Sequence, residues 1–294
     1  MVTKRRMATM KNTILVIGAT GNQGVAVLQA LLKTDFALRA FVRTHAPKQP
    51  QNPKIHKLKE QGIEIMEGDL DDFDSLTHAM NGCYGVFSVI NFQDGGVAKE
   101  EARGKRVADA AKKTGIEHFV YSSVGGADRS SGVPHFESKW HVEQHIRKLA
   151  LASSIIRPTT FMTNLMEMPA AMRFIALSMS RGSFAEKPLQ MIAVQDIGKW
   201  AAHMFLYREH YLSRAVEIAG DEVTFSQMVS AYKKVYNKTP GSMWLPPSLF
   251  SMGDIGKMFT WITKYGYNAD LTMNRAEIPD LLTFEQFLAL KQPL

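Results

Sequence analysis

Short apolar runs alternate with helical patterns of apolar residues through the first half of the chain. The apolar runs, rich in β-branched and aromatic residues, cover residues 13–17, 36–42, 63–66, 84–90, 118–122 and 153–157. Apolar positions recur at helical spacing between them, in residues 22–33, 55–61, 72–80, 99–114 and 135–150. Successive strand–helix units predict an α/β fold with a Rossmann-type doubly wound parallel sheet. Right-handed crossovers then bring the connecting loops to one edge of the sheet.

The alternation loosens after Pro158, and the later elements are expected to be fewer and shorter. They are a helix over 196–206, a strand over 215–218 and a helix that starts at a capping box of Thr224 and Gln227 and runs to Lys234. Aromatic residues and prolines dominate residues 244–267.

This change in pattern divides the chain into three parts. Residues 1–12 form a basic N-terminal extension, and residues 13–158 form the Rossmann domain. Residues 159–294 form a smaller C-terminal α/β lobe, interleaved with the sheet and folded over its loop edge. A substrate or partner would bind at that edge.

Composition excludes several classes of protein. With 45% hydrophobic and 21% charged residues among 294, the chain is globular rather than disordered. A single cysteine, Cys83, excludes an intramolecular disulfide and a cysteine-based zinc site. Cys83 precedes an apolar run, so we interpret it as a core residue.

We expect a cytoplasmic protein, because a single cysteine suits a reducing compartment and the N-terminal pattern does not form a signal peptide. Lys4, Arg5 and Arg6 resemble the start of a signal peptide, but the following apolar run at 14–17 is too short and ends at Gly18. No stretch has the length needed to span a bilayer. The net charge of +7 comes from scattered Lys and Arg residues, which predicts a solvated surface and no nucleic-acid partner.

A glycine motif lies between the first strand and the first helix. Gly18 permits a tight turn, Gly21 lets the backbone approach a pyrophosphate, and Gly24 lets helix pack on strand. The amides at the helix start then face the phosphates. Thr20, Asn22 and Gln23 would add side-chain hydrogen bonds to the cofactor or satisfy donors at the helix start. A glycine-rich turn without a ligand is the alternative, which the strand–turn–helix context disfavours.

The end of the second strand predicts NADP(H) over NAD(H). Arg43 stands where NAD-binding proteins usually have an acidic residue, and an arginine can bind a 2′-phosphate. His45 and Lys48 add positive charge nearby. The alternative is an exposed arginine at a strand end. Asp69, after the third strand, could reach the adenine or serve as a turn residue.

Eight segments together resemble the NmrA-like branch of the atypical short-chain dehydrogenases. They are Ile17–Gly24, Val42-Arg43, Glu67–Asp72, His135–Lys139, Arg157-Pro158 with Phe161 and Asn164, Ala193–Gly198, Gly220-Asp221 and Thr283–Phe287. The resemblance spans the chain after residue 12. It implies NADP(H) binding at the glycine loop, with the nicotinamide near Asn91-Phe92. Arg43, Asp69, Leu70, Asn91 and Lys139 complete the implied cofactor-binding set.

Classical members of this superfamily carry Tyr-x-x-x-Lys on one helix, where the four-residue spacing puts both side chains on one face. Lys139 occupies the lysine position, but His135 replaces the tyrosine. His135 could supply a proton, or it could be a spectator on the first helical turn. Lys139 would bind the nicotinamide ribose or act as the base, with a surface lysine as the alternative. Ser122 and Ser123 are candidates for the catalytic serine, unless Val124 takes that place.

Two further patterns lie on the same predicted helix. His141 and His145 have metal-binding spacing, but no third ligand is in view, so we predict no metal site. Glu143 lies four residues after Lys139, which is compatible with an ion pair.

Methionines follow Pro158, at positions 162, 166, 168, 172 and 179. They suit either an adaptable apolar pocket or core filling.

We favour an NADPH-dependent reductase of a small quinone- or carbonyl-like acceptor, apolar or aromatic, because this segment resembles a small-molecule pocket. The alternative is a catalytically silent redox sensor that regulates a protein partner, with residues 93–98 and the lobe as moving parts. We expect a monomer or homodimer.

Overall fold

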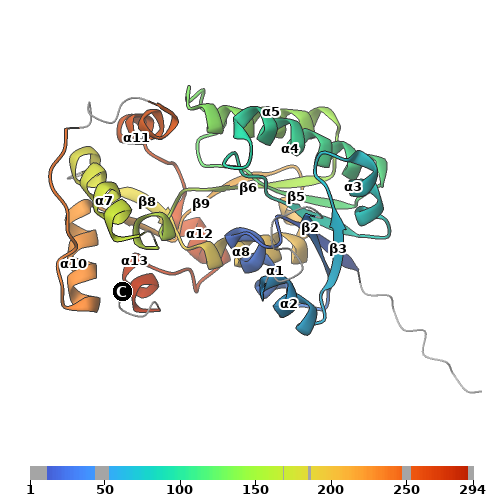
Figure 1. The fold of residues 1–294 in the computed structure, drawn as a ribbon, viewed down its shortest axis with the longest axis horizontal. Helices are drawn as coiled ribbons and strands as arrows, with labels where there is room; N and C mark the ends of the chain where they lie inside the picture. Colours follow the sequence, from blue (N-terminus) through green and yellow to red (C-terminus); the bar gives the residue numbers. More distant parts are fainter. Residues whose placement is uncertain (1–11, 44–52, 168, 185–186, 247–252, 291–294) are drawn as a thin grey trace, which may run out of the picture.

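A seven-stranded parallel sheet forms the centre of the computed structural model, which describes residues 12–43, 53–167, 169–184, 187–246 and 253–290. The strand order is β3-β2-β1-β4-β5-β6-β9 (Figure 1). The strands are β1 (Thr13–Ile17), β2 (Ala37–Arg43), β3 (Glu64–Gly68), β4 (Gly85–Ser88), β5 (His118–Ser122), β6 (Ser153–Pro158) and β9 (Ala215–Ile218). The predicted doubly wound parallel sheet is confirmed.

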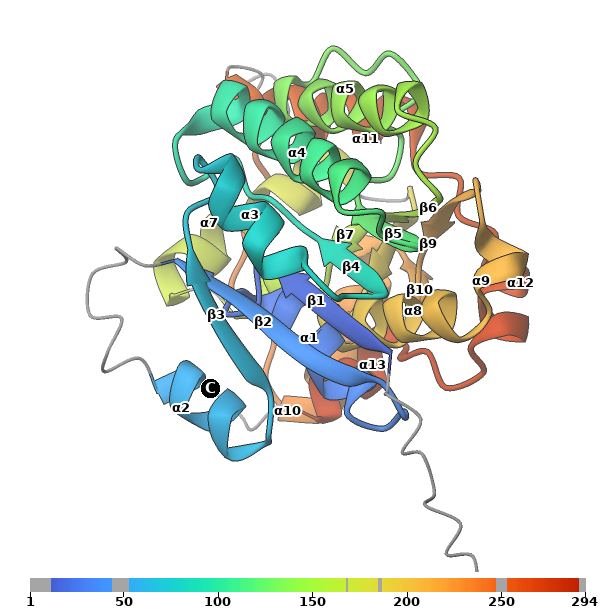
Figure 2. The ribbon, with the colours of Figure 1, turned by 90° about the vertical axis from the view of Figure 1, so that its right-hand side faces the viewer.

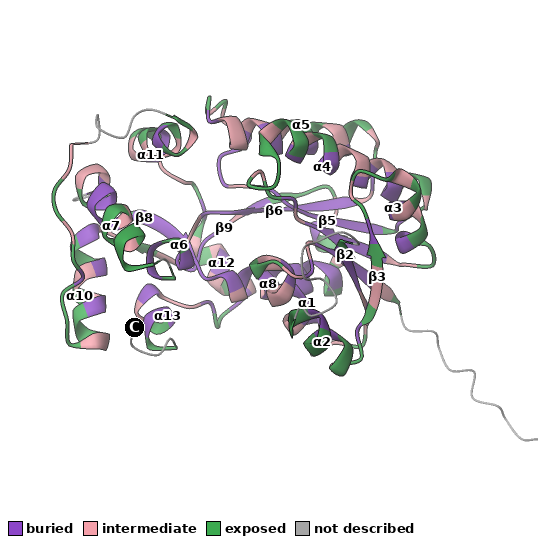
Figure 3. Cartoon of the chain, viewed as in Figure 1, coloured by how far each residue is buried: buried purple, intermediate pink, exposed green. Residues whose placement is uncertain are grey.

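Helices cover both faces of this sheet (Figure 2). One face carries α1 (Asn22–Leu31), α2 (Pro53–Glu60) and α8 (Val194–Leu206), with α9 (Arg208–Tyr211) following. The other carries α3 (Phe73–Met80), α4 (Gly96–Lys113) and α5 (Pro134–Lys148). The central strands β4, β5 and β6 are buried along their whole length (Figure 3). Burial on both faces accounts for the apolar residues at the centre of each of these strands.

The rest of the chain forms a lobe around a three-stranded sheet of order β10-β8-β7. Its elements are β7 (Thr160–Phe161), α6 (Thr163–Met166), α7 (Ala170–Phe184), β8 (Leu189–Ile192), β10 (Asp221–Val223), α10 (Phe225–Tyr236), α11 (Gly253–Tyr265), α12 (Leu271–Glu277) and α13 (Phe284–Ala289). The capping box of Thr224 and Gln227 is confirmed. Most other elements of the lobe escaped prediction, because two- to four-residue strands show no periodicity and α11 lies in the aromatic segment.

Two elements that follow the start of the lobe return to the main sheet. Strand β9 pairs in parallel with β6, and α8 packs against α1. At the α1–α8 contact, a Cβ on Gly198 would lie 2.3 Å from the backbone oxygen of Ala26. Only glycine permits this approach, so the lobe and the main sheet are built from interleaved segments.

The lobe packs against the start of α5. Its core contains Val133 and Phe136 together with Trp261 of α11. The rings of Phe136 and Trp261 lie 5.4 Å apart in an edge-to-face arrangement. The lobe therefore covers the edge of the sheet from which the strand-to-helix loops leave.

Cys83 is half-buried just before β4, and burial raises the pKa of its thiol. Across the described ranges, we find no helix with the length and apolar character that crossing a membrane requires.

Buried His118 makes the stability of the fold sensitive to acid. Its Nε2 lies 2.8 Å from Ser154 Oγ, and that hydroxyl donates to the backbone oxygen of Tyr211. Burial, with a smaller contribution from Arg208, lowers the pKa of His118 to about 4. The unfolded chain therefore binds more protons than the folded chain between about pH 6.5 and about pH 4.

We expect the free energy of unfolding to fall as pH drops through this window, by up to about 3 kcal/mol from His118. His118→Gln should remove this part of the pH dependence. Urea unfolding at about pH 7 and about pH 4.5 measures it, with the exposed His141→Gln as the matched control. The same acid sensitivity in His118→Gln and the wild type would contradict the assignment.

Candidate functional site

The turn between β1 and α1 depends on its glycines. Gly18 has φ +78°, and a Cβ there would lie 2.8 Å from Val89 Cγ1. Gly21 N donates to Gly18 O across 2.9 Å, which closes the turn. A Cβ on Gly24 would lie 2.1 Å from Gly18 O. Larger residues at Gly18 and Gly24 would therefore displace the start of α1 from the sheet.

The N-terminus of α1 is open to an anion. Its N-cap is Gly21, and no side chain caps the first turn. The amides of this turn and the positive end of the helix dipole therefore face the sheet edge. Gln23 Oε1 accepts a hydrogen bond from Ser122 Oγ at 2.7 Å, and Thr20 O accepts one from Lys54 Nζ at 2.9 Å. Asn22 is exposed.

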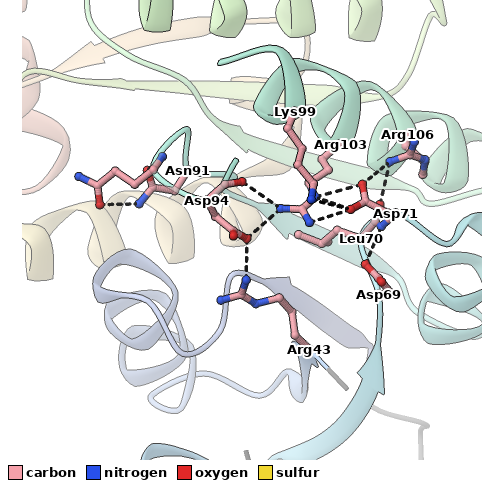
Figure 4. Close-up of polar contacts among 10 residues, drawn as sticks. Arg43, Asp69, Leu70, Asp71, Asn91, Asp94, Lys99, Arg103 and Arg106 are labelled. Carbon is pink, nitrogen blue, oxygen red and sulfur yellow. Dashed lines mark hydrogen bonds and ion pairs between the residues drawn. The ribbon is translucent and has the colours of Figure 1, made fainter. Parts of the chain in front are cut away.

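Beside this turn lies a network of alternating charges (Figure 4). Arg43 Nη1, at the end of β2, lies 2.6 Å from Asp94 Oδ2. Arg103 Nη1 of α4 lies 2.8 Å from the same oxygen, and its Nη2 lies 2.7 Å from Asp71 Oδ2. The Arg103 side chain is only 6% exposed, whereas that of Arg43 is 52% exposed. Arg43 is thus the accessible end of a network anchored on Arg103.

Arg103 also sets the charge state of both carboxylates. Its hydrogen bond lowers the pKa of Asp71 to about 2 and lowers the pKa of Asp94. Lys99 and Arg106 add further contacts to Asp71. Both acids are therefore ionised at neutral pH. The sequence did not single out Arg103 or Asp94, because their pairing depends on tertiary contact.

The other residues predicted beside the adenine and nicotinamide lie at turns of the same edge. Asp69 Oδ1 accepts from Asp71 N at 2.9 Å, which confirms its part in a turn, while contact with adenine stays a prediction. Leu70 packs against the core beneath α3 and α4. Asn91 Oδ1 accepts from Gln93 N at 2.9 Å. His45 and Lys48 lie outside the described residues.

Lys139 is buried at the carboxyl ends of β4 and β5. Its Nζ donates to Ile90 O at 2.7 Å and to Ser122 O at 3.4 Å, and it lies 3.1 Å from Glu100 Oε1. Its residue is 8% exposed, so the surface-lysine alternative is wrong. Ser138 Oγ donates to the other oxygen of Glu100 at 2.7 Å.

The ion pair between Lys139 and Glu143 that the spacing would allow is not formed. Glu143 is fully buried and accepts two hydrogen bonds from Arg157, at 3.0 and 2.7 Å, and one from Arg147. The parallel guanidinium–carboxylate geometry is stronger than a single lysine contact. Glu100 therefore serves as the counterion of Lys139. No sequence signal distinguished Glu100 from its solvated neighbours.

His135 lies one turn before Lys139 and contacts aromatic rings. Its ring stacks on Phe92, with centroids 4.8 Å apart, and meets Phe136 edge-on at 4.9 Å. Its Nδ1 lies 2.8 Å from Asp254 Oδ2 of α11. His135 is therefore placed between the loop after β4 and the lobe.

The remaining histidines of α5 have carboxylate partners. His141 Nδ1 lies 2.9 Å from Glu101, and His145 Nε2 lies 2.7 Å from Asp109. Across the described ranges, no cluster of three or more metal-binding side chains is present. Ser123 is buried close to Ser122, and its Oγ has no hydrogen-bond partner among the described residues.

The methionines are mainly core residues. Met162, Met166 and Met179 are at most 9% exposed, whereas Met172 of α7 is 54% exposed. Met168 lies outside the described residues. Core filling therefore accounts for three of the five, and an adaptable pocket at this segment stays a prediction.

Comparison with known proteins identifies the family. A family model described as NmrA-like matches residues 10–288. The chain belongs to the NmrA-like family. An NmrA-like family domain-containing protein of Dictyostelium discoideum is 26% identical over 303 residues, covering 95% of this chain and 97% of the relative. The resemblance found in the motifs is thus confirmed.

Solved structures extend the likeness to the fold. The NADPH-dependent quinone oxidoreductase of Escherichia coli, in complex with NADPH, matches with a TM-score of 0.76 and 20% identity over 94% of this chain and 99% of that chain. The negative transcriptional regulator NmrA, in complex with NADP, matches with a TM-score of 0.74 and 19% identity, over 95% of this chain and 94% of that chain. At these identities the comparison establishes the NmrA-like fold, not an activity.

The buried Lys139–Glu100 pair predicts a large change in stability. Glu100→Gln leaves the Lys139 ammonium without its counterion, so we expect the free energy of unfolding to fall by about 3 kcal/mol. The double variant Glu100→Gln/Lys139→Met removes both charges and should recover most of the loss. Urea unfolding of the variants as a double-mutant cycle measures the coupling. Additive losses would show that the two groups do not interact.

Proposed function

We propose that this NmrA-like protein binds NADP(H) and uses NADPH to reduce a small apolar or aromatic acceptor of the quinone or carbonyl class. The observation that carries the proposal is the meeting of three groups at one sheet edge. They are the uncapped amides of α1, the accessible guanidinium of Arg43 and the buried ammonium of Lys139. The chemistry of these anion-binding and cationic groups suits a dinucleotide that carries an extra phosphate.

Each part of the cofactor has residues of suitable chemistry. The turn from Gly18 to Gly24 would hold the pyrophosphate, with Thr20, Asn22 and Gln23 at its rim. Arg43 would bind the 2′-phosphate once that phosphate replaces Asp94 as its partner. Asp69 and Leu70 would line the adenine. Asn91 and Lys139 would lie at the nicotinamide ribose.

Bound NADPH would supply a hydride, which carries two electrons, to the acceptor. Lys139 would orient the nicotinamide ribose, because Glu100 and Ile90 O hold its ammonium in one position. The lobe packed over the sheet edge would exclude water from the site. The NADPH-bound quinone oxidoreductase of similar fold supports this assignment.

The proposed function first predicts which cofactor the protein prefers. Arg43→Ala should weaken NADPH binding about 10- to 100-fold and leave NADH binding unchanged, because only NADPH carries the 2′-phosphate. Asp94→Asn should tighten NADPH binding about two- to fivefold, since an exposed ion pair no longer competes for Arg43. Fluorescence titration with both cofactors measures this, and Arg181→Ala, a lobe arginine, is the control. Equal loss of both cofactors in Arg43→Ala would contradict the assignment.

The second prediction concerns turnover. We expect the wild type to oxidise NADPH with at least one of a panel of quinones, aldehydes and imines. The double variant Glu100→Gln/Lys139→Met should lose about 100-fold in turnover, because the ribose is no longer oriented. The partly exposed pair Glu101 and Lys105 on α4 gives a matched control, Glu101→Gln/Lys105→Met.

The sensor hypothesis makes the opposite prediction. Tight NADPH binding with no acceptor consumed, together with a protein partner whose binding depends on the redox state of the cofactor, would overturn the reductase proposal.

A further inference from the structure

A histidine–aspartate contact joins α5 to α11 at the nicotinamide end of the proposed site. Asp254 lies in the first turn of α11, and Trp261 lies seven residues later on the same face of that helix. The packing of Trp261 on Phe136, at 5.4 Å, fixes this face against the start of α5. The core contact between the two helices thus brings the Asp254 carboxylate to His135.

The surroundings of His135 leave its two ring nitrogens in different roles. Nδ1 lies 2.8 Å from Asp254 Oδ2, at ion-pair distance, without the alignment of a regular hydrogen bond. No hydrogen-bond partner of Nε2 lies among the described residues. The Phe92 ring stacks on the imidazole at 4.8 Å and limits its rotation. The side chains of His135 and Asp254 are 13% and 25% exposed, so water reaches the pair only partly.

Lys139 is poorly suited to donate a proton itself. Its Nζ donates to Ile90 O and Ser122 O, and it lies 3.1 Å from Glu100 Oε1 without the alignment of a hydrogen bond. An ammonium has three donors, and the proposed function assigns the third to the nicotinamide ribose, which leaves none for the acceptor. If the acceptor gains a proton at oxygen, another group at this end of the site must deliver it.

We propose that His135 and Asp254 form the proton-donating pair of the reduction, an inference that rests on the proposed reductase function. Asp254 is a positioning residue: its carboxylate, at ion-pair distance from Nδ1, orients the ring and stabilises the imidazolium. His135 then presents Nε2–H to the acceptor oxygen. The four-residue spacing puts His135 and Lys139 on the same face of α5, so proton donor and ribose-binding group act from one helix.

The step balances as follows. The acceptor receives a hydride, with its two electrons, from NADPH, and its oxygen forms an O–H bond as the Nε2–H bond of His135 breaks. The N–H electron pair stays on Nε2, which leaves a neutral imidazole with Nδ1–H directed at Asp254. Water returns one proton to Nε2. The net change is one NADPH and one proton consumed for each acceptor reduced by two electrons.

Kinetics provide the first test. His135→Gln should lower kcat about 100-fold, and Asp254→Asn should lower it about tenfold, with KM and the NADPH dissociation constant within about twofold of the wild type. The double variant should be no slower than His135→Gln, because the two residues act as a unit. A second histidine–aspartate pair, His145 of α5 and Asp109 of α4, is the matched control. His145→Gln and Asp109→Asn should leave kcat within about twofold.

Magnetic resonance of isotope-labelled histidine in the NADP-bound protein provides a readout independent of turnover. We expect a protected Nδ1–H signal for His135 that is lost or strongly shifted in Asp254→Asn and unchanged in Asp109→Asn. If acceptors are reduced but Asp254→Asn affects neither kcat nor this signal, the pair is not the proton donor and the reductase proposal stands. If NADPH binds and no acceptor is reduced, the reductase proposal fails, and the donor role of the pair fails with it.

Discussion

The buried ammonium of Lys139 is the constraint on which the site depends. A charge at 8% exposure is tolerated only when other groups replace its water. Those groups come from the ends of β4 and β5 and from α4. Three separate elements must therefore be correctly placed before the ammonium has its hydrogen-bond acceptors and its counterion. The same requirement holds the start of α5 against the sheet edge. His135, one turn earlier, is positioned as a consequence.

The ion pair at Arg43, unlike the buried Lys139 ammonium, is open to solvent. Arg43 and Asp94 are both about half exposed, and exposed ion pairs contribute little to stability. Arg103, by contrast, is almost fully buried and binds both Asp71 and Asp94. The buried arginine therefore gives the loop its shape, and the exposed one is free to exchange partners. A phosphate arriving at Arg43 would compete only with the weak end of the network.

The interleaving of the chain ties the lobe to the sheet edge that carries the candidate site. Because α8 and β9 return to the main sheet, the lobe is connected to it by several chain crossings rather than by one hinge. The close contact of Gly198 with Ala26 then permits little movement between α8 and α1. Trp261 and Asp254 approach α5 from the lobe, so the site is complete only when the lobe is packed.

The sequence alone determined the parallel sheet, the glycine turn and the positions of Arg43, His135 and Lys139, because those features depend on local periodicity and on spacing within one helix. It also indicated the NmrA-like family. Tertiary structure decided the partners. Glu100 rather than Glu143 forms the ion pair with Lys139, because α4 lies beside α5. Glu143 instead pairs with Arg157 of β6. Asp94, Arg103 and Asp254 join the site from segments distant in sequence, and such pairings follow from how the elements pack, which spacing along the chain does not encode.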